Sequence, residues 1–309
     1  MNNRTFSDYS LLVLKGVAMG IANKIPGVSG GIVAVVTGFY RELIFSFQRL
    51  NIKAIRLLLR GRFSSFWRYI NGAFLCALLA GVILSYFTLS LLLDLALTTY
   101  PVYVWAGFFG LVLASAILLF RRYNSWSRQN ICLAVLGLVV GMGLSVLSPS
   151  SQNTHMLYVF FCGMISIVGM TLPGLSGSFL LILLGNYTLL LVDAVNAFGK
   201  WVASLFFSNI DISAQDENYA LLFGIFLVGS LVGIGGLSTL IHRIQQKADK
   251  ELQAILIGFV FGSLFILWPY NKTSHMEPTA LNQTPLWAMI WGLLGMVSVF
   301  LLEYYERRK

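Results

Sequence analysis

A short polar break near the N-terminus holds the residues best suited to binding a ligand. It reads NKIPGVSGG, residues 23 to 31, and interrupts an apolar stretch. The break combines an amide, an ammonium group, a hydroxyl and several glycines, which permit tight turns and a close approach of the backbone to a ligand. Lys24 would be strongly disfavoured in apolar surroundings without an opposite charge. We therefore expect Lys24 to have an anionic partner, either a protein carboxylate or an anionic substrate.

A second copy of this break lies 147 positions further along the chain. Seven residues are identical in this single register, including a P-G-apolar-S-G string. The matched pairs are Pro26 and Pro173, Gly27 and Gly174, Ser29 and Ser176, Gly30 and Gly177, Gly38 and Gly185, Tyr40 and Tyr187, and Leu43 and Leu190. Such self-similarity at a fixed offset indicates an internal duplication of about half the chain.

No arrangement typical of an enzyme accompanies the two breaks. The sequence shows no acid–base pair, no nucleophile beside a base, no glycine loop followed by Gly-Lys and no HExxH string. Cys76, Cys132 and Cys162 lie in apolar runs without a CxxC pair, which argues against a disulfide framework or a zinc site. We therefore expect neither catalysis nor a cofactor nor a metal.

The composition indicates an all-α polytopic membrane protein. The chain of 309 residues is 57% hydrophobic and 11% charged, with a mean hydropathy of +0.79. Soluble domains carry about 25% charged residues. The net charge of +9 could suggest a nucleic-acid partner, but the basic residues lie in short loops between apolar runs, where they report membrane topology instead.

Each half is expected to contain a re-entrant broken-helix hairpin and three transmembrane helices. The two arms of the first break hold roughly 13 residues each and would cover about 20 Å, too little for a hydrocarbon core of about 30 Å. In the first repeat, 1–150, we expect a hairpin at 10–44, a basic amphipathic stretch at 45–69 and spans at 70–93, 100–120 and 130–148. In the second repeat, 151–309, we expect a hairpin at 156–192, an outer loop at 193–218 and spans at 219–241, 252–268 and 285–302.

The charge pattern predicts that the two repeats are inverted relative to each other. Placing the basic loops inside leaves only Lys200 and Lys272 on the outer side and puts both termini in the cytoplasm. A re-entrant hairpin enters and leaves the membrane on the same side, so each repeat crosses the membrane three times. The second repeat therefore begins on the opposite side from the first. Glycines spaced by four predict close helix contacts. These pairs are Gly16 and Gly20, Gly137 and Gly141, Gly229 and Gly233, and Gly258 and Gly262.

Inverted symmetry would bring the two breaks together near the middle of the bilayer, where irregular backbone is tolerated only beside protein or a water-filled cavity. The free N–H groups of the outgoing half-helices would favour an anion there. The expected substrate-binding residues are Asn23, Lys24, Pro26, Gly27, Ser29, Gly30, Gly31, Thr171, Gly174, Ser176, Gly177 and Ser178. Thr171 matches Lys24, so the site would be asymmetric in charge. The alternative is that Lys24 lies shallower and snorkels to the surface.

Five further residues are candidates for gating or coupling: Lys15, Arg41, Glu42, Ser115 and Ser263. For Arg41 and Glu42 the alternative is anchoring at the cytoplasmic interface, where an arginine also suits a helix C-terminus. For Ser115 and Ser263 the alternative is simple helix packing, although they occupy nearly matching places in the two halves.

The paired motifs resemble the PopT-like family of bacterial polyprenyl-phosphate transporters. The resemblance rests on Lys15-Gly16, Met19-Gly20, Asn23, Ile25 to Gly31, Gly38, Tyr40, Leu43-Ile44, Leu172 to Ser178, Gly185, Tyr187, Gly262 to Leu264 and Trp268-Pro269. Ile32 departs from the family, which often has threonine there. The resemblance implies movement of undecaprenyl phosphate from the outer to the inner leaflet of the bacterial cytoplasmic membrane, for recycling of the carrier lipid in cell-wall synthesis.

The membrane potential limits how an anionic lipid can be moved inward. Moving one negative charge inward against an interior-negative potential is opposed by about 2.3 kcal/mol per 100 mV. Inward transport would therefore need protonation of the head group or a co-transported cation, H⁺ or Na⁺. A carrier for a small soluble anion is the alternative within transport, and a membrane-bound phosphatase is the alternative among enzymes. The sequence leaves a homo-oligomer open.

Overall fold

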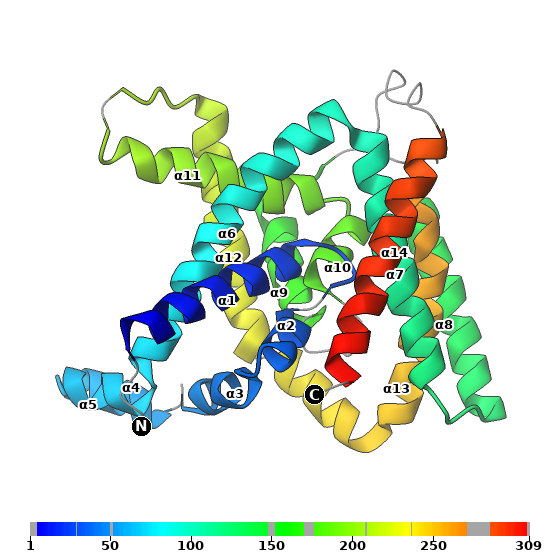
Figure 1. The fold of residues 1–309 in the computed structure, drawn as a ribbon, viewed down its shortest axis with the longest axis horizontal. Coiled ribbons are helices and arrows are strands. Elements are labelled where there is room, and N and C mark those ends of the chain that lie inside the picture. The colour runs from blue at the N-terminus through cyan, green and yellow to red at the C-terminus, as the bar shows by residue number, and fades with distance from the viewer. Residues whose placement is uncertain are drawn as a thin grey trace.

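The computed structural model describes residues 5–28, 30–49, 52–147, 152–169, 176–207, 209–235, 237–270 and 285–307, and these residues are helical apart from short turns (Figure 1). The helices of the first half are α1 (Phe6–Lys24), α2 (Gly30–Val36), α3 (Tyr40–Gln48), α4 (Ile52–Leu59), α5 (Phe63–Tyr69), α6 (Gly72–Thr99), α7 (Pro101–Arg122) and α8 (Arg128–Leu147). Those of the second half are α9 (Met156–Gly169), α10 (Gly177–Leu183), the π-helix η1 (Leu189–Asp193), α11 (Ala194–Ser204), α12 (Ala214–Gly235), α13 (Leu237–Leu267) and α14 (Pro285–Arg307).

Six of the described helices are long and apolar enough to cross a membrane: α6, α7, α8, α12, α13 and α14. They correspond to the six expected spans, with ends that differ by a few residues. The largest difference is in α13, which begins at Leu237 rather than 252 and has a kink at Ala248, where φ is −145°. Pro101 begins α7 directly after α6, a position where its missing N–H is no loss.

The first hairpin differs in length from the expectation. Helix α1 starts at a capping box in which Thr5 and Asp8 bond each other's backbone. It continues through Asn23 and Lys24, so its 19 residues cover about 28 Å rather than 20 Å. The chain then turns at Gly27, whose φ of +79° favours glycine, and returns through α2. The expectation of two arms of about 13 residues was therefore wrong for both arms, because α1 is longer and the return helix α2 holds only 7 residues.

The return arms of the two hairpins agree residue by residue. Helices α2 and α10 each hold 7 residues, and Gly30 and Gly177, which begin them, are the pair matched in the duplication. Each arm is followed by a glycine with positive φ, +82° at Gly38 and +71° at Gly185. The two return arms therefore have the same length and end at equivalent positions of the repeated sequence.

Glycines bring four pairs of helices into close contact, because a Cβ atom added at these positions would meet the backbone of the partner helix. The pairs are α1 with α6 through Gly16 and Gly81, α9 with α12 through Gly163 and Gly229, α8 with α13 through Gly137, Gly141, Gly258 and Gly262, and α7 with α14 through Gly110 and Gly295. Each pair has a counterpart in the other half. The close contacts expected from the glycine spacing are therefore present.

Both termini lie at the lower end of the molecule in Figure 1, together with α3, α4, α5, the α7–α8 connection and the bend within α13. Helix α11 lies at the opposite end. The stretch 193–218, expected as a loop, contains α11 and the first turn of α12. The largest buried cluster is built around the second hairpin, including Phe179, Leu181, Tyr187 and Leu190.

Candidate functional site

Direct hydrogen bonds join the first tip, between α1 and α2, to two residues that flank α10 in the second half. The backbone N–H of Gly27 donates to Ser176 Oγ at 3.0 Å, a contact between residues 149 positions apart. The hydroxyl of Tyr187 donates to the carbonyl oxygen of Lys24 at 3.2 Å. Tyr187 is 1% exposed, so this bond lies in the interior. The break in the first half is therefore held directly by the second half.

Ser176 connects the first tip to helix α10. Its Oγ accepts from the backbone N–H of Phe179 at 3.2 Å and so caps α10. The hydroxyl oxygen of Ser178 lies 3.2 Å from the same oxygen, within hydrogen-bond distance. Because all three of these residues are buried, the network is shielded from the surroundings.

Helix α7 supports the first tip from the other side. The hydroxyl of Ser115 donates to the Gly27 carbonyl at 2.6 Å and also to Leu111 O, one turn back, at 2.9 Å. A Cβ atom at Gly27 would lie 2.9 Å from the backbone nitrogen of Val112. Glycine is thus needed here for its positive φ and for the close approach of the tip to α7.

Lys24 is fully buried, with 0% exposure. Its Nζ donates to the carbonyl oxygen of Tyr86 on α6 at 2.9 Å and lies 5.3 Å from the centre of the Tyr86 ring. Among the described residues, no carboxylate lies within 4.0 Å of this ammonium group. The geometry does not match the snorkelling alternative. A carbonyl dipole and an aromatic face stabilise the cation, but no carboxylate in the described part of the chain balances it.

The side chain of Asn23 links the two sides of the first tip. Its Oδ1 accepts from the backbone N–H of Gly30 at 3.0 Å, which ties the end of α1 to the start of α2. A side chain at position 30 would collide with Asn23. Pro26 is buried between them, and Gly31 follows as the second residue of α2.

A cavity of about 460 Å³ lies beside Asn23 of the first tip, among α6, α11, α12 and the second hairpin. Its polar lining comes from Asn23 of the first tip, Ser178 of the second, and Tyr86, Ser166 and Ser230. The rest of the lining is apolar, mainly from α6, α11 and α12. Ligand pockets commonly have this character, a largely apolar wall with a few polar groups that fix orientation.

Several expected site residues lie at the tips, and others do not. Asn23, Lys24, Pro26, Gly27, Gly30, Gly31, Ser176, Gly177, Ser178 and Ser115 are gathered at or beside the two tips. Ser29, Thr171 and Gly174 lie outside the described residues.

Four candidate residues lie apart from the tips. Lys15 donates to the carbonyl of Thr37 at 2.8 Å, at the far end of α2. Arg41 is exposed on α3, and Glu42 accepts from Asn71 at 2.7 Å. Ser263 bonds the carbonyl of Phe259 within its own helix, at 2.6 Å. These contacts position helices and loops rather than a ligand at the tips.

Two aromatic residues of the site were missing from the sequence-based expectation. Tyr86 supplies the carbonyl that holds Lys24 and lines the cavity, and Tyr187 supplies the hydroxyl that holds the first tip. The sequence pointed to Tyr187, because it matches Tyr40 in the duplication. Tyr86 had none, since it is one of many apolar residues in α6 and its role depends on a contact across 62 positions.

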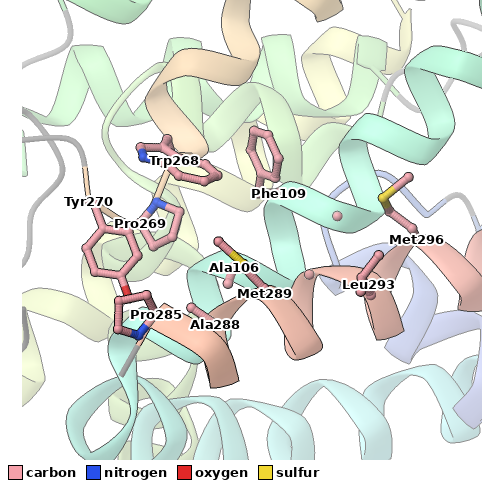
Figure 2. A pocket seen from close by; sticks show the side chains of 12 residues that line it. Ala106, Phe109, Trp268, Pro269, Tyr270, Pro285, Ala288, Met289, Leu293 and Met296 are labelled. Carbon is pink, nitrogen blue, oxygen red and sulfur yellow. The ribbon is translucent and has the colours of Figure 1, made fainter. Parts of the chain in front are cut away.

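A separate cavity of about 440 Å³ lies beside α7 and α14 (Figure 2). Phe109 and Trp268 face each other there with ring centres 5.2 Å apart, and Met289 and Leu293 of α14 lie below them. Its lining includes none of the tip residues. This cavity therefore does not belong to the candidate site.

Comparison with known proteins identifies the family. The family model described as undecaprenyl phosphate translocase-like matches residues 19–285. A polyprenyl-phosphate transporter of Vibrio cholerae is 33% identical over 280 residues, which cover 90% of this chain and 84% of that protein. A polyprenyl-phosphate transporter of Staphylococcus aureus is 27% identical over 275 residues, covering 85% and 87%. No solved structure matches.

The family model covers the tip and return arm of the first hairpin, the whole second hairpin and five of the six long apolar helices, and it reaches the start of the sixth. The resemblance expected from the paired breaks is therefore confirmed. The protein is a multi-pass membrane protein, and the chain belongs to the undecaprenyl phosphate translocase-like family.

Proposed function

We propose that this protein moves undecaprenyl phosphate from the outer to the inner leaflet of the bacterial cytoplasmic membrane, so that the carrier lipid can be used again in cell-wall synthesis. The phosphate binds between the tips of the two hairpins. The family and both relatives, which are polyprenyl-phosphate transporters, support the substrate class. The geometry of the tips supports the place of the phosphate.

The observation that carries this proposal is the buried ammonium group of Lys24 without a carboxylate partner among the described residues. A buried charge is strongly disfavoured unless it is paired. An anionic head group would supply the missing charge, and Asn23 and Ser178 of the adjacent cavity would supply hydrogen bonds. Because α2 and α10 hold only 7 residues each, the ammonium group outweighs the helix dipoles as the source of positive potential.

The expected duplication indicates how the two hairpins move during transport. We take 1–150 and 151–309 as two inverted repeats whose hairpins are re-entrant. The matching return arms and the paired glycine contacts support this. Alternating access then arises when one hairpin moves against the other around a fixed site. In this movement Ser115 stays bonded to the first tip, and Ser263 has the matching role in the second half. Lys15, Arg41 and Glu42 adjust the cytoplasmic end of the first hairpin.

The orientation follows from charge. The end of the molecule that carries both termini also carries the basic segments around α4, α5, the α7–α8 connection and the bend within α13, and we assign it to the cytoplasm (Figure 1). Inward movement of an anion against the membrane potential then requires an accompanying cation, H⁺ or Na⁺.

Liposomes with undecaprenyl phosphate in both leaflets test the proposal. An impermeant phosphatase outside consumes the outer pool, and the inner pool becomes accessible only by transport. We expect wild-type protein to make the inner pool accessible at least about tenfold faster than empty liposomes, as for a catalysed crossing of a charged group. A sodium or pH gradient across the same liposomes identifies the coupling ion. Equal rates with and without protein would contradict the proposal.

The same liposomes separate the alternatives. Uptake of radiolabelled inorganic phosphate without movement of the lipid would establish a carrier for a small soluble anion. Phosphate release by the purified protein, without the added phosphatase, would establish a membrane-bound phosphatase.

A further inference from the structure

A third cavity, of about 990 Å³, lies on the apolar side of the first tip. Four helices form its walls: α1, α6, α7 and α14. Its lining is almost entirely apolar, with Leu93, Ala96, Phe108 and Leu294 among the side chains. The volume is at the upper end of the usual range for ligand pockets, about 300 to 1,000 Å³.

This cavity touches the same tip as the polar cavity. Ile25 and Val28 of the first tip line the apolar cavity, whereas Asn23 lines the polar one. Helix α6 also contributes to both, with Tyr86 on the polar side and Leu89 on the apolar side. The tip therefore lies between a small compartment with hydrogen-bonding groups and a large one without them.

The far end of the apolar cavity is lined by aromatic residues. Tyr100, Tyr103, Trp287 and Trp291 line it there, where α6 ends and α14 begins. Tyr100, Trp287 and Trp291 are each about half exposed. Aromatic residues of this kind collect where membrane and water meet. This end lies opposite the end that carries both chain termini (Figure 1).

We propose that the isoprenoid chain of the transported lipid lies in this apolar cavity while its phosphate is bound at the tips. This inference rests on the proposed function and adds the place of the tail. An empty apolar cavity of this size would leave its lining without contacts, which is strongly unfavourable. A flexible hydrocarbon chain fills it, and its attachment to a phosphate explains why the cavity begins at the tip. The lipid enters from the outer leaflet past the aromatic residues.

Binding to purified protein tests this inference, with Ala96→Trp as the main variant because Ala96 lines the cavity wall on α6. Ala80→Trp is the matched control, because Ala80 is exposed on the same helix and lines none of the three cavities. The probes are undecaprenyl phosphate and geranyl phosphate, which carry the same head group on a long and a short chain. We expect Ala96→Trp to weaken binding of the long-chain lipid by about tenfold or more, through lost apolar contacts, and to leave geranyl phosphate unchanged.

Ser298→Trp on α14 narrows the cavity from the opposite wall and provides a second variant if Ala96→Trp does not fold. Equal binding of the long-chain lipid to wild type and both cavity variants would overturn the placement of the tail and leave the proposed function intact. Failure of wild type to bind either phosphate would overturn the proposed function itself, and the inference with it. Weakened binding of both probes by Ala96→Trp, with Ala80→Trp unchanged, would also overturn the inference, because the head-group site would then be the one affected.

Discussion

The two hairpins share a backbone but differ in what surrounds them. Their return arms have equal length and end in glycines with positive φ. The second hairpin lies in the largest buried cluster, whereas residues of the first belong to smaller ones. The matched tyrosines show the same contrast, since Tyr187 is 1% exposed and Tyr40 is 43% exposed.

The two hairpins also differ in where the buried positive charge lies. The less deeply packed first hairpin holds the buried Lys24. The second hairpin bonds the backbone of the first tip through neutral groups, the hydroxyls of Ser176 and Tyr187. The difference suggests a division of roles in which the second hairpin is the fixed reference and the first carries the charge.

The largest expected effect is a loss of stability from Gly27→Ala. Alanine at a positive φ costs about 1 to 2 kcal/mol, and its Cβ would press on the backbone of α7, which adds about 1 to 3 kcal/mol. Gly38→Ala is the matched control, because Gly38 has nearly the same φ and nothing within 4 Å of the added Cβ. Denaturant titration in detergent measures both. Equal losses would mean that the first tip does not depend on its contact with α7.

Tyr187→Phe should have a moderate effect. It removes the hydroxyl that donates to Lys24 O and leaves that buried carbonyl without this bond, which costs about 1 to 2 kcal/mol. Tyr40→Phe, at the matched place in the first hairpin, should change stability by less than about 0.5 kcal/mol because Tyr40 is exposed. The same titration compares the two variants. A larger effect at Tyr40 would reverse the assignment of the fixed and the mobile hairpin.

The smallest expected effect comes from Lys15→Met. Lys15 bonds the carbonyl of Thr37 just beyond the last turn of α2, and loss of that bond costs about 0.5 to 1.5 kcal/mol. Transport in liposomes should stay within about twofold of wild type, since the lost bond is far from the tips and worth about 1 kcal/mol. Loss of transport with unchanged stability would instead place Lys15 in the transport pathway and enlarge the site beyond the tips.

The sequence predicted those features that depend on local pattern. Apolar runs gave the six long helices, glycine spacing gave the close helix contacts, and the repeated P-G-apolar-S-G string gave two equivalent return arms. It underestimated α1, because Asn23 and Lys24 were counted as part of the break. Both continue the helix, since their side chains find partners at Gly30 and Tyr86.

Other features depend on contacts between distant segments and had no local signal. Helix α11 lies in the stretch 193–218, whose polar and acidic residues indicated a loop. The contact between Gly27 and Ser176 was expected only in general terms, as two tips that face each other. The partners of Lys24 depend on how α1 lies against α6, which periodicity alone does not determine.

The most direct test of the central claim is binding of undecaprenyl phosphate and the neutral alcohol undecaprenol to purified wild type, Lys24→Met and Ser176→Ala. Methionine keeps the length of lysine and removes its charge, and Lys15→Met serves as the control for a lost charge in the same helix. We predict that wild type binds the phosphate selectively and that Lys24→Met weakens this binding by about tenfold or more, as for a charged hydrogen bond, with a smaller loss in Ser176→Ala. Equal affinity for the alcohol, or phosphate binding unchanged in both tip variants, would contradict a head-group site between the tips.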